Sequence, residues 1–276
     1  MNSSVILSVI TFVYGFAAFL YVAAWVFKKE KVSKIATWVV YVAILGNTAG
    51  IGLRWVESYQ QGFGHAPLSN LYESLVFFAL VIGVLYLFIE KKYKLPVIGA
   101  VAMPLAFLSI AYASMVQNSN IQPLMPALKS NWLIAHVVAC FIGYSAFAIA
   151  FGISCLYLIK RVNPESKGFV FSSTPSLSIL DDLTHQMVKF GFLFLTVGII
   201  TGAAWANSAW GRYWGWDPKE TWSLITWFIY AAMLHARLVR GWQGKRIAIM
   251  SIIGFAAVLF TYFGVNLLPG LHSYGQ

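Results

Sequence analysis

Residues 131–159 read NWLIAHVVACFIGYSAFAIAFGISCLYLI and contain no Lys, Arg, Asp or Glu. About 20 apolar residues suffice for an α-helix to cross the ~30 Å hydrocarbon core of a membrane. Within that core every backbone amide must be hydrogen-bonded inside its own helix or inside a closed barrel. An uninterrupted apolar run lacks the alternation that barrel strands show. The run therefore predicts a membrane-spanning helix.

The rest of the chain repeats this pattern. Of its 276 residues 59% are hydrophobic and 10% are charged, and the mean hydropathy is +0.73, which excludes an ordinary soluble domain. We predict an all-α integral membrane protein, organised as a single helical membrane domain over residues 1–276. Its eight expected transmembrane helices lie near 4–27, 35–55, 70–89, 95–115, 131–159, 186–206, 220–239 and 246–268.

The distribution of positive charge predicts the orientation in the membrane. The net charge is +10, and most of the 19 Lys and Arg residues fall in alternate loops. Basic loops stay in the cytoplasm, which places both termini and the loop over 205–220 on the external, periplasmic or lumenal, side. Because the charge flanks apolar helices, we expect contact with membrane lipid and no nucleic-acid partner. The cations that fall on the external side are Arg54, Lys129, Arg212 and Lys219.

Two of the five histidines are expected at the external face. His136 follows Trp132 by four residues, which puts it about 6 Å inside the external end of its helix. His272 comes just after Pro269 and Gly270, which stop the last helix. Two neutral imidazoles at one level can be the axial ligands of a haem iron. Alternatively, each is an interfacial histidine satisfied by water or by a backbone carbonyl.

His235 is predicted to lie inside the membrane. It falls about 21 Å beyond Thr221, and an intramembrane histidine is a candidate functional residue whose partner has to be found. His185 is expected in the cytoplasmic loop before the sixth helix, too shallow to meet it. Either a hydroxyl on a neighbouring helix satisfies His235, or its partner belongs to another chain. Neither His185 nor His65 receives a role.

A tryptophan-rich loop, AWANSAWGRYWGWDPKETW over 204–222, connects the sixth and seventh predicted helices. Its glycines would let a flat ligand approach the backbone, and indole rings stack against such ligands. Arg212 and Lys219 could bind carboxylates such as haem propionates. The alternative is an aromatic belt at the membrane surface. The candidate platform residues are Trp205, Trp210, Trp214 and Trp216.

The end of this loop has the pattern of a helix start. Asp217 precedes Pro218, and Glu220 follows three residues after the aspartate. An acid at the N-cap, proline at the first helical position and glutamate at the third form a capping box. Asp217 is therefore expected to cap the seventh helix, to contact a ligand, or to do both.

These segments resemble a known family. WGRYWGWDPKETW resembles the tryptophan-rich WWD signature of haem-handling membrane proteins of cytochrome c maturation. GHAPLSNLYESL (64–75), AHVVACFIGY (135–144) and GVNLLPGLHSYG (264–275) look like the CcsA family, also called ResC. The eight predicted helices and the terminal histidine favour this family over the shorter six-helix CcmC.

The resemblance implies a cofactor that is also the substrate, haem b. His136 and His272 would be its external axial ligands and His235 its intramembrane ligand, with Asp217 and the four candidate tryptophans near the external haem. A CcsB-like, or ResB-like, membrane protein would supply the second intramembrane ligand and an external domain.

The implied function is that of a haem-handling subunit of a cytochrome c synthase, or haem lyase, complex. The thiols of an apocytochrome c CxxCH motif would add to the haem vinyl groups, without a catalytic nucleophile or base from this chain. The membrane would be the bacterial cytoplasmic membrane, or a thylakoid membrane for a plastid protein. The alternatives are a b-type haem electron-transfer subunit and a haem exporter without ligation activity.

Overall fold

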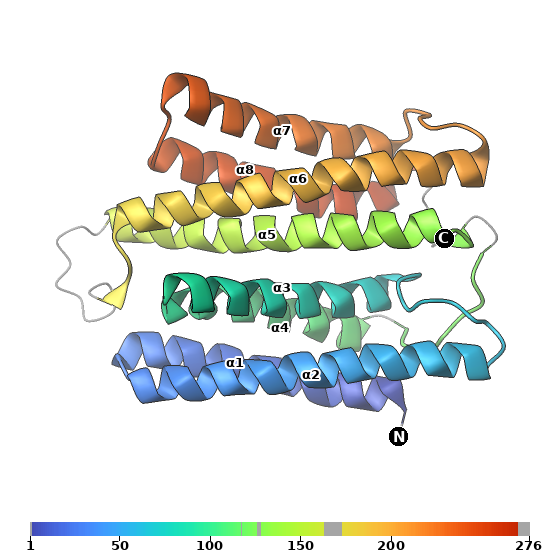
Figure 1. Ribbon diagram of the computed structural model, residues 1–276, viewed down its shortest axis with the longest axis horizontal. Coiled ribbons are helices and arrows are strands. Elements are labelled where there is room, and N and C mark those ends of the chain that lie inside the picture. The colour runs from blue at the N-terminus through green and yellow to red at the C-terminus, as the bar shows by residue number, and fades with distance from the viewer. Residues whose placement is uncertain (1, 117, 126–127, 163–172, 270–276) are drawn as a thin grey trace. The chain divides into compact units, whose positions relative to one another are not determined.

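The computed structural model describes residues 2–116, 118–125, 128–162 and 173–269, and these residues contain no strand. They form eight helices that are long and apolar enough to cross a membrane (Figure 1). The prediction of an all-α, eight-helix integral membrane protein is therefore confirmed. The helices are α1 (Ser3–Phe27), α2 (Glu30–Gln60), α3 (Leu71–Tyr93), α4 (Gly99–Val116), α5 (Asn131–Val162), α6 (Leu177–Trp210), α7 (Pro218–Arg240) and α8 (Lys245–Tyr262).

The helices group into two compact units. One comprises Met1–Lys129 with Asn163–Pro175, and the other comprises Ser130–Val162 with Ser176–Gln276. In the first unit α1 packs against α2 and α4, and α3 packs against α4. In the second unit α5 packs against α6 and α8, and α7 packs against α8 (Figure 1). Short 3₁₀ segments, η1 (Pro96–Ile98) and η4 (Gly264–Leu267), adjoin α4 and α8.

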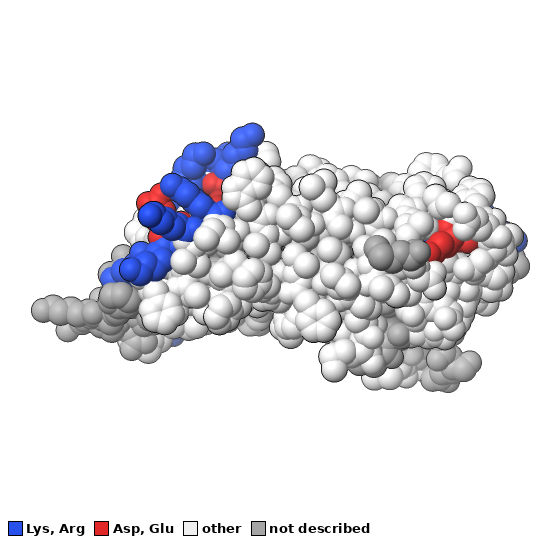
Figure 2. Space-filling model, turned by 90° about the horizontal axis from the view of Figure 1, so that it is seen from below, with Lys and Arg blue, Asp and Glu red and all other residues white. Residues whose placement is uncertain are grey.

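Charged side chains lie at the helix ends. Figure 2 shows Lys and Arg gathered at one end of the face it presents, while the middle is almost free of charge. In the first unit the basic residues that follow α1 and those that end α3 come to the same end because the helices alternate in direction. This is the pattern on which the predicted orientation rests, and the sidedness itself stays a prediction.

The α6 helix begins earlier than the sequence analysis predicted. It starts at Leu177, after Ser176, whose hydroxyl accepts a hydrogen bond from the Ile179 N–H at 3.4 Å. The prediction that His185 lies in a loop is therefore wrong, because an apolar window detects only the part of a helix that crosses hydrocarbon. Asp181, one turn before His185, binds Arg237 of α7 at 2.6 Å.

That ion pair fixes the depth of His185. Since α6 and α7 run in opposite directions, the turn that follows Asp181 along α6 lies level with the turn that precedes Arg237 along α7. This is the level of His235, so the expectation that His185 is too shallow is also wrong. His185 nevertheless makes no hydrogen bond to His235 within the described residues, and its Nδ1 is buried without a partner there.

A buried ion pair holds the end of α2 against the start of α3. The Arg54 Nε–H donates to Glu73 Oε1 at 2.8 Å, and both side chains are almost completely buried. The other Arg54 nitrogens donate to the carbonyl oxygens of Ser119 and Asn120, and the second Glu73 oxygen accepts from Ser69. Because breaking a buried pair leaves an uncompensated charge, this cluster fixes the loops at one end of the first unit.

Candidate functional site

His136 lies on α5 where this helix faces α6. Its Nδ1 is 2.7 Å from the carbonyl oxygen of Gly198. A carbonyl oxygen only accepts hydrogen bonds, so Nδ1 carries the proton and the lone pair of the neutral ring lies on Nε2. Metal-binding histidines have this arrangement, in which the second ring nitrogen donates to a carboxylate, a carbonyl or water. The alternative, in which a backbone carbonyl satisfies the histidine, therefore applies to Nδ1. It does not exclude a ligand role for Nε2.

Two glycines of α6 make room for this ring. A Cβ at Gly202 would lie 2.6 Å from His136 Nδ1, and a Cβ at Gly198 would lie 2.6 Å from Cys140 Sγ. The two glycines of the sequence GIITG (198–202) thus leave a notch in the surface of α6. The side chains of His136 and Cys140, one turn apart on α5, fill this notch. Small residues spaced by four allow close helix approach in membranes. This glycine spacing is the sequence signal from which the surroundings of His136 could have been predicted.

Two of the four candidate tryptophans belong to the surroundings of His136. Trp205 is 3% exposed, and its ring lies nearly parallel to the imidazole, with centroids 6.1 Å apart and 14° between the planes. Trp210, the last residue of α6, meets Trp205 edge-on at 4.9 Å. The structure therefore brings His136, Trp205 and Trp210 together at the α5–α6 contact.

The other two tryptophans form a separate pair in the loop. Gly211 ends α6 with a φ of 73°, and the rings of Trp214 and Trp216 then meet edge-on at 5.7 Å. Trp216 has a φ of 57°, which is costly for a bulky residue, and it is 69% exposed. Strained backbone of this kind clusters at functional sites. A Cβ at Gly215 would lie 2.7 Å from Arg212 Nε, so the guanidinium rests on this glycine.

The predicted capping box at the start of α7 is confirmed. Asp217 Oδ1 accepts from the Lys219 N–H at 3.0 Å, and Glu220 Oε2 accepts from the Asp217 N–H at 3.2 Å. The same glutamate oxygen also accepts from the Gly215 N–H at 2.7 Å. Glu220 therefore ties the tryptophan loop to the helix, a role beyond the cap that the sequence pattern predicts.

Replacing Asp217 separates its two expected roles. Asp217→Ala should lower the free energy of unfolding by about 1 kcal/mol, because the cap is lost, whereas Asp217→Asn should cost much less because asparagine caps equally well. Thermal unfolding of the purified protein measures both values. Equal loss of bound haem in the two variants, with Asp217→Asn as stable as the wild type, would instead assign the carboxylate charge to the ligand.

The end of α8 comes close to this site. Tyr262 meets Phe141 of α5 edge-on at 5.5 Å, five residues beyond His136 along that helix. Four residues later, Asn266 Oδ1 accepts from Lys219 Nζ at 3.4 Å. The chain thus leaves α8 toward the level of His136 and the start of α7. His272, the second predicted external ligand, lies outside the described residues.

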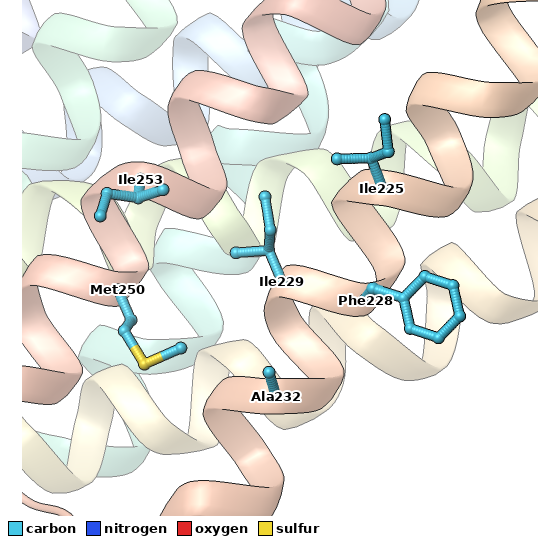
Figure 3. A pocket seen from close by; sticks show the side chains of 6 residues that line it. All are labelled: Ile225, Phe228, Ile229, Ala232, Met250 and Ile253. Carbon is cyan, nitrogen blue, oxygen red and sulfur yellow. The ribbon is translucent and has the colours of Figure 1, made fainter.

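His235 is exposed on the surface of α7. It makes no hydrogen bond to any other residue that the structure describes, so no hydroxyl of a neighbouring helix satisfies it. On α7 it continues an exposed stripe at helical spacing that contains Ile225, Phe228 and Ala232. These residues line an apolar groove of ≈ 410 Å³ between α7 and α8, together with Ile229, Met250 and Ile253 (Figure 3).

Comparison with known proteins covers most of the chain. The family model described as "Cytochrome C assembly protein" matches residues 68–272, a range that holds the three candidate histidine ligands and the tryptophan loop. The chain is 41% identical to the cytochrome c biogenesis protein CcsA of Prochlorococcus marinus (strain NATL2A), over 95% of this chain and 93% of the relative. It is 42% identical to CcsA of Guillardia theta, over 91% and 89% of the two chains.

A solved structure shows the same fold. The cytochrome c haem lyase CcmF matches with a TM-score of 0.72 over 98% of this chain, at 18% sequence identity. The chain spans 48% of that protein, and at this identity the likeness concerns the fold alone. Family membership rests on the family model and on the relatives with about 40% identity. The chain belongs to the CcsA family of cytochrome c biogenesis proteins.

Proposed function

We propose that this chain receives haem b within the membrane, holds it at an external site between His136 and His272, and enables its attachment to apocytochrome c. Membership of the family establishes a role in cytochrome c maturation by a multi-pass membrane protein, and such maturation involves haem. The proposal adds the sites, the order in which haem occupies them and the chemistry.

The observation that carries the proposal is the 2.7 Å contact of His136 Nδ1 with the Gly198 carbonyl oxygen. With Nδ1–H donated to the Gly198 carbonyl, Nε2 has the lone pair that iron requires. In the same unit, the edge-on pair Trp214 and Trp216 belongs to a loop whose backbone is fixed by Glu220. A flat porphyrin can pack against such indole edges and faces.

The path of the chain after α8 supports His272 as the second ligand. His272 follows Pro269, the last described residue, by three positions, so the chain keeps their Cα atoms within about 11 Å of each other. The contacts of Tyr262 with Phe141 and of Asn266 with Lys219 place the described residues that precede Pro269 near the end of the unit that holds His136.

The exposed face of α7 supports a partner protein at the intramembrane stage. A polar ring facing hydrocarbon is costly, so His235 is expected to meet a polar partner or ligand rather than lipid. The apolar groove beside it offers the surface that a membrane helix of another protein would cover. We propose that a CcsB-like protein docks here and supplies the second imidazole to haem on its way to the external site.

The proposed reaction needs little from the side chains of this protein. Each substrate thiol adds across a haem vinyl group: the sulfur forms a bond to one carbon, the thiol proton goes to the other, and no oxidant is consumed. Holding sulfur and vinyl carbon in contact supplies most of the rate advantage. Two imidazoles keep the iron in place until the histidine of the CxxCH motif replaces one of them.

Co-expression tests the proposal. The chain is expressed with a CcsB-like partner and a CxxCH substrate in a host without its own cytochrome c maturation system, and covalent haem is detected in the denatured substrate. We expect haem in the CxxCH substrate and none in a control with both cysteines changed to serine. Haem in the complex but none in the CxxCH substrate would refute the synthase role and favour an electron carrier or an exporter.

A further inference from the structure

We propose that Gly198, Gly202 and Trp205 of α6 form a positioning device for His136, so that Trp205 acts through the imidazole rather than as part of the surface that faces haem. This inference rests on the proposed external haem site and assigns the residues that give its ligand a fixed orientation. It also assigns different roles to the four tryptophans of the loop region: Trp205 and Trp210 orient the ligand, and Trp214 and Trp216 face the haem.

Each of the three residues constrains the ring in a different way. The Gly198 carbonyl accepts a hydrogen bond from Nδ1–H and so fixes both the tautomer and the direction of Nε2. Gly202 leaves the space that the ring fills, since a Cβ there would overlap Nδ1 at 2.6 Å and Cε1 at 2.8 Å. Trp205 lies nearly parallel to the ring, 14° from its plane, and limits its rotation.

The burial of Trp205 favours a role behind the ligand. Its side chain is 3% exposed, whereas Trp216 is 69% exposed. A residue with so little accessible surface has little area to offer a porphyrin. Trp210 packs edge-on against Trp205 and so helps to hold the Trp205 ring in place. Trp210, Trp205 and His136 thus form a continuous series of ring contacts at the α5–α6 contact.

The hydrogen bond also tunes the ligand. Donation of Nδ1–H to a carbonyl makes Nε2 a stronger base, which favours the ferric over the ferrous iron. A methyl group at position 202 would overlap Nδ1 and Cε1, so the ring has to shift, and a shift of Nδ1 disturbs this bond. Gly202→Ala should therefore lower haem retention about tenfold, a typical cost for losing an outer-shell partner, and should raise the reduction potential of the haem that remains.

The matched control is Gly191→Ala. Gly191 lies on the same helix and faces the same neighbour, because a Cβ there would meet the Phe147 ring at 2.6 Å, but it lies three turns away from Gly202. This variant should disturb α5–α6 packing as much as Gly202→Ala does and leave the spectrum and the potential of the haem unchanged. Both proteins are purified with their partner, and only monodisperse material is compared.

A second pair of variants covers the case in which Gly202→Ala does not fold. Trp205→Leu removes the flat ring and should weaken haem retention, while Trp205→Phe keeps a ring and should restore most of it. The inference is overturned if Gly202→Ala matches Gly191→Ala, or if Trp205→Leu keeps the wild-type spectrum and potential. If wild-type haem does not depend on His136 at all, the proposed external site fails instead, and His136→Ala shows this separately.

Discussion

Replacing His235 with alanine should deplete haem from the whole complex. In the proposed order, haem reaches the external site only after the intramembrane site, so loss of the first ligand empties both. The loss of an outer-shell partner of a metal ligand already costs about 10- to 100-fold in affinity, and we expect at least the same from loss of the ligand itself. The measurement is the haem-to-protein ratio of the complex purified with its partner.

Phe228→Ala is the matched control for His235→Ala. Phe228 belongs to the same exposed stripe of α7 and lines the groove beside Ile225 and Ala232, but it carries no ligating atom. Because this variant alters the proposed docking surface, the amount of bound partner is measured first, and complexes that retain the partner should load haem normally. Normal loading of His235→Ala would show that the histidine has no ligand role and that its exposure is accidental.

Replacing His136 with alanine should have the largest effect at the external face. Haem should still enter the membrane site, while haem held externally and haem attached to the substrate should both fall at least tenfold, because one axial ligand is missing. Haem staining of the denatured substrate and the haem content of the complex measure the two quantities separately.

Cys140→Ala provides the comparison for His136→Ala. Cys140 lies one turn further along α5 and fills the other half of the α6 notch, at Gly198, but it is buried. Its replacement removes the contact of Cys140 Sγ with His136 Nδ1 at 3.7 Å but keeps the imidazole and its hydrogen bond to the Gly198 carbonyl. We expect near-normal attachment in Cys140→Ala. An equal loss in both variants would mean that His136 acts through packing rather than as a ligand.

The fold could be predicted from the sequence because hydrocarbon leaves few alternatives. The apolar runs and the capping box at Asp217 rest on local rules, and the structure confirms both. The ends of α2 and α6 were missed because these helices continue into polar sequence, where hydropathy no longer marks them. This is the error that placed His185 in a loop.

The surroundings of the candidate ligands were harder to predict than the fold, because they depend on which sides of neighbouring helices are in contact. Sequence alone identified His136, but only the α5–α6 contact shows that the Gly198 carbonyl accepts a hydrogen bond from its ring and that Gly202 leaves space for it. Likewise, position along α7 predicted the depth of His235, whereas the side of the helix on which it lies comes only from the structure, which shows this ring exposed.

The absorption spectrum of the complex in a His235→Ala background shows whether His136 and His272 together bind the haem iron. This background removes the intramembrane site, and haem is added to the purified protein from solution. We expect a six-coordinate, low-spin spectrum from two imidazole ligands, and we expect it to be lost when His136 and His272 are also changed to alanine. An unchanged low-spin spectrum in the triple variant would show that these two histidines are not the external ligands.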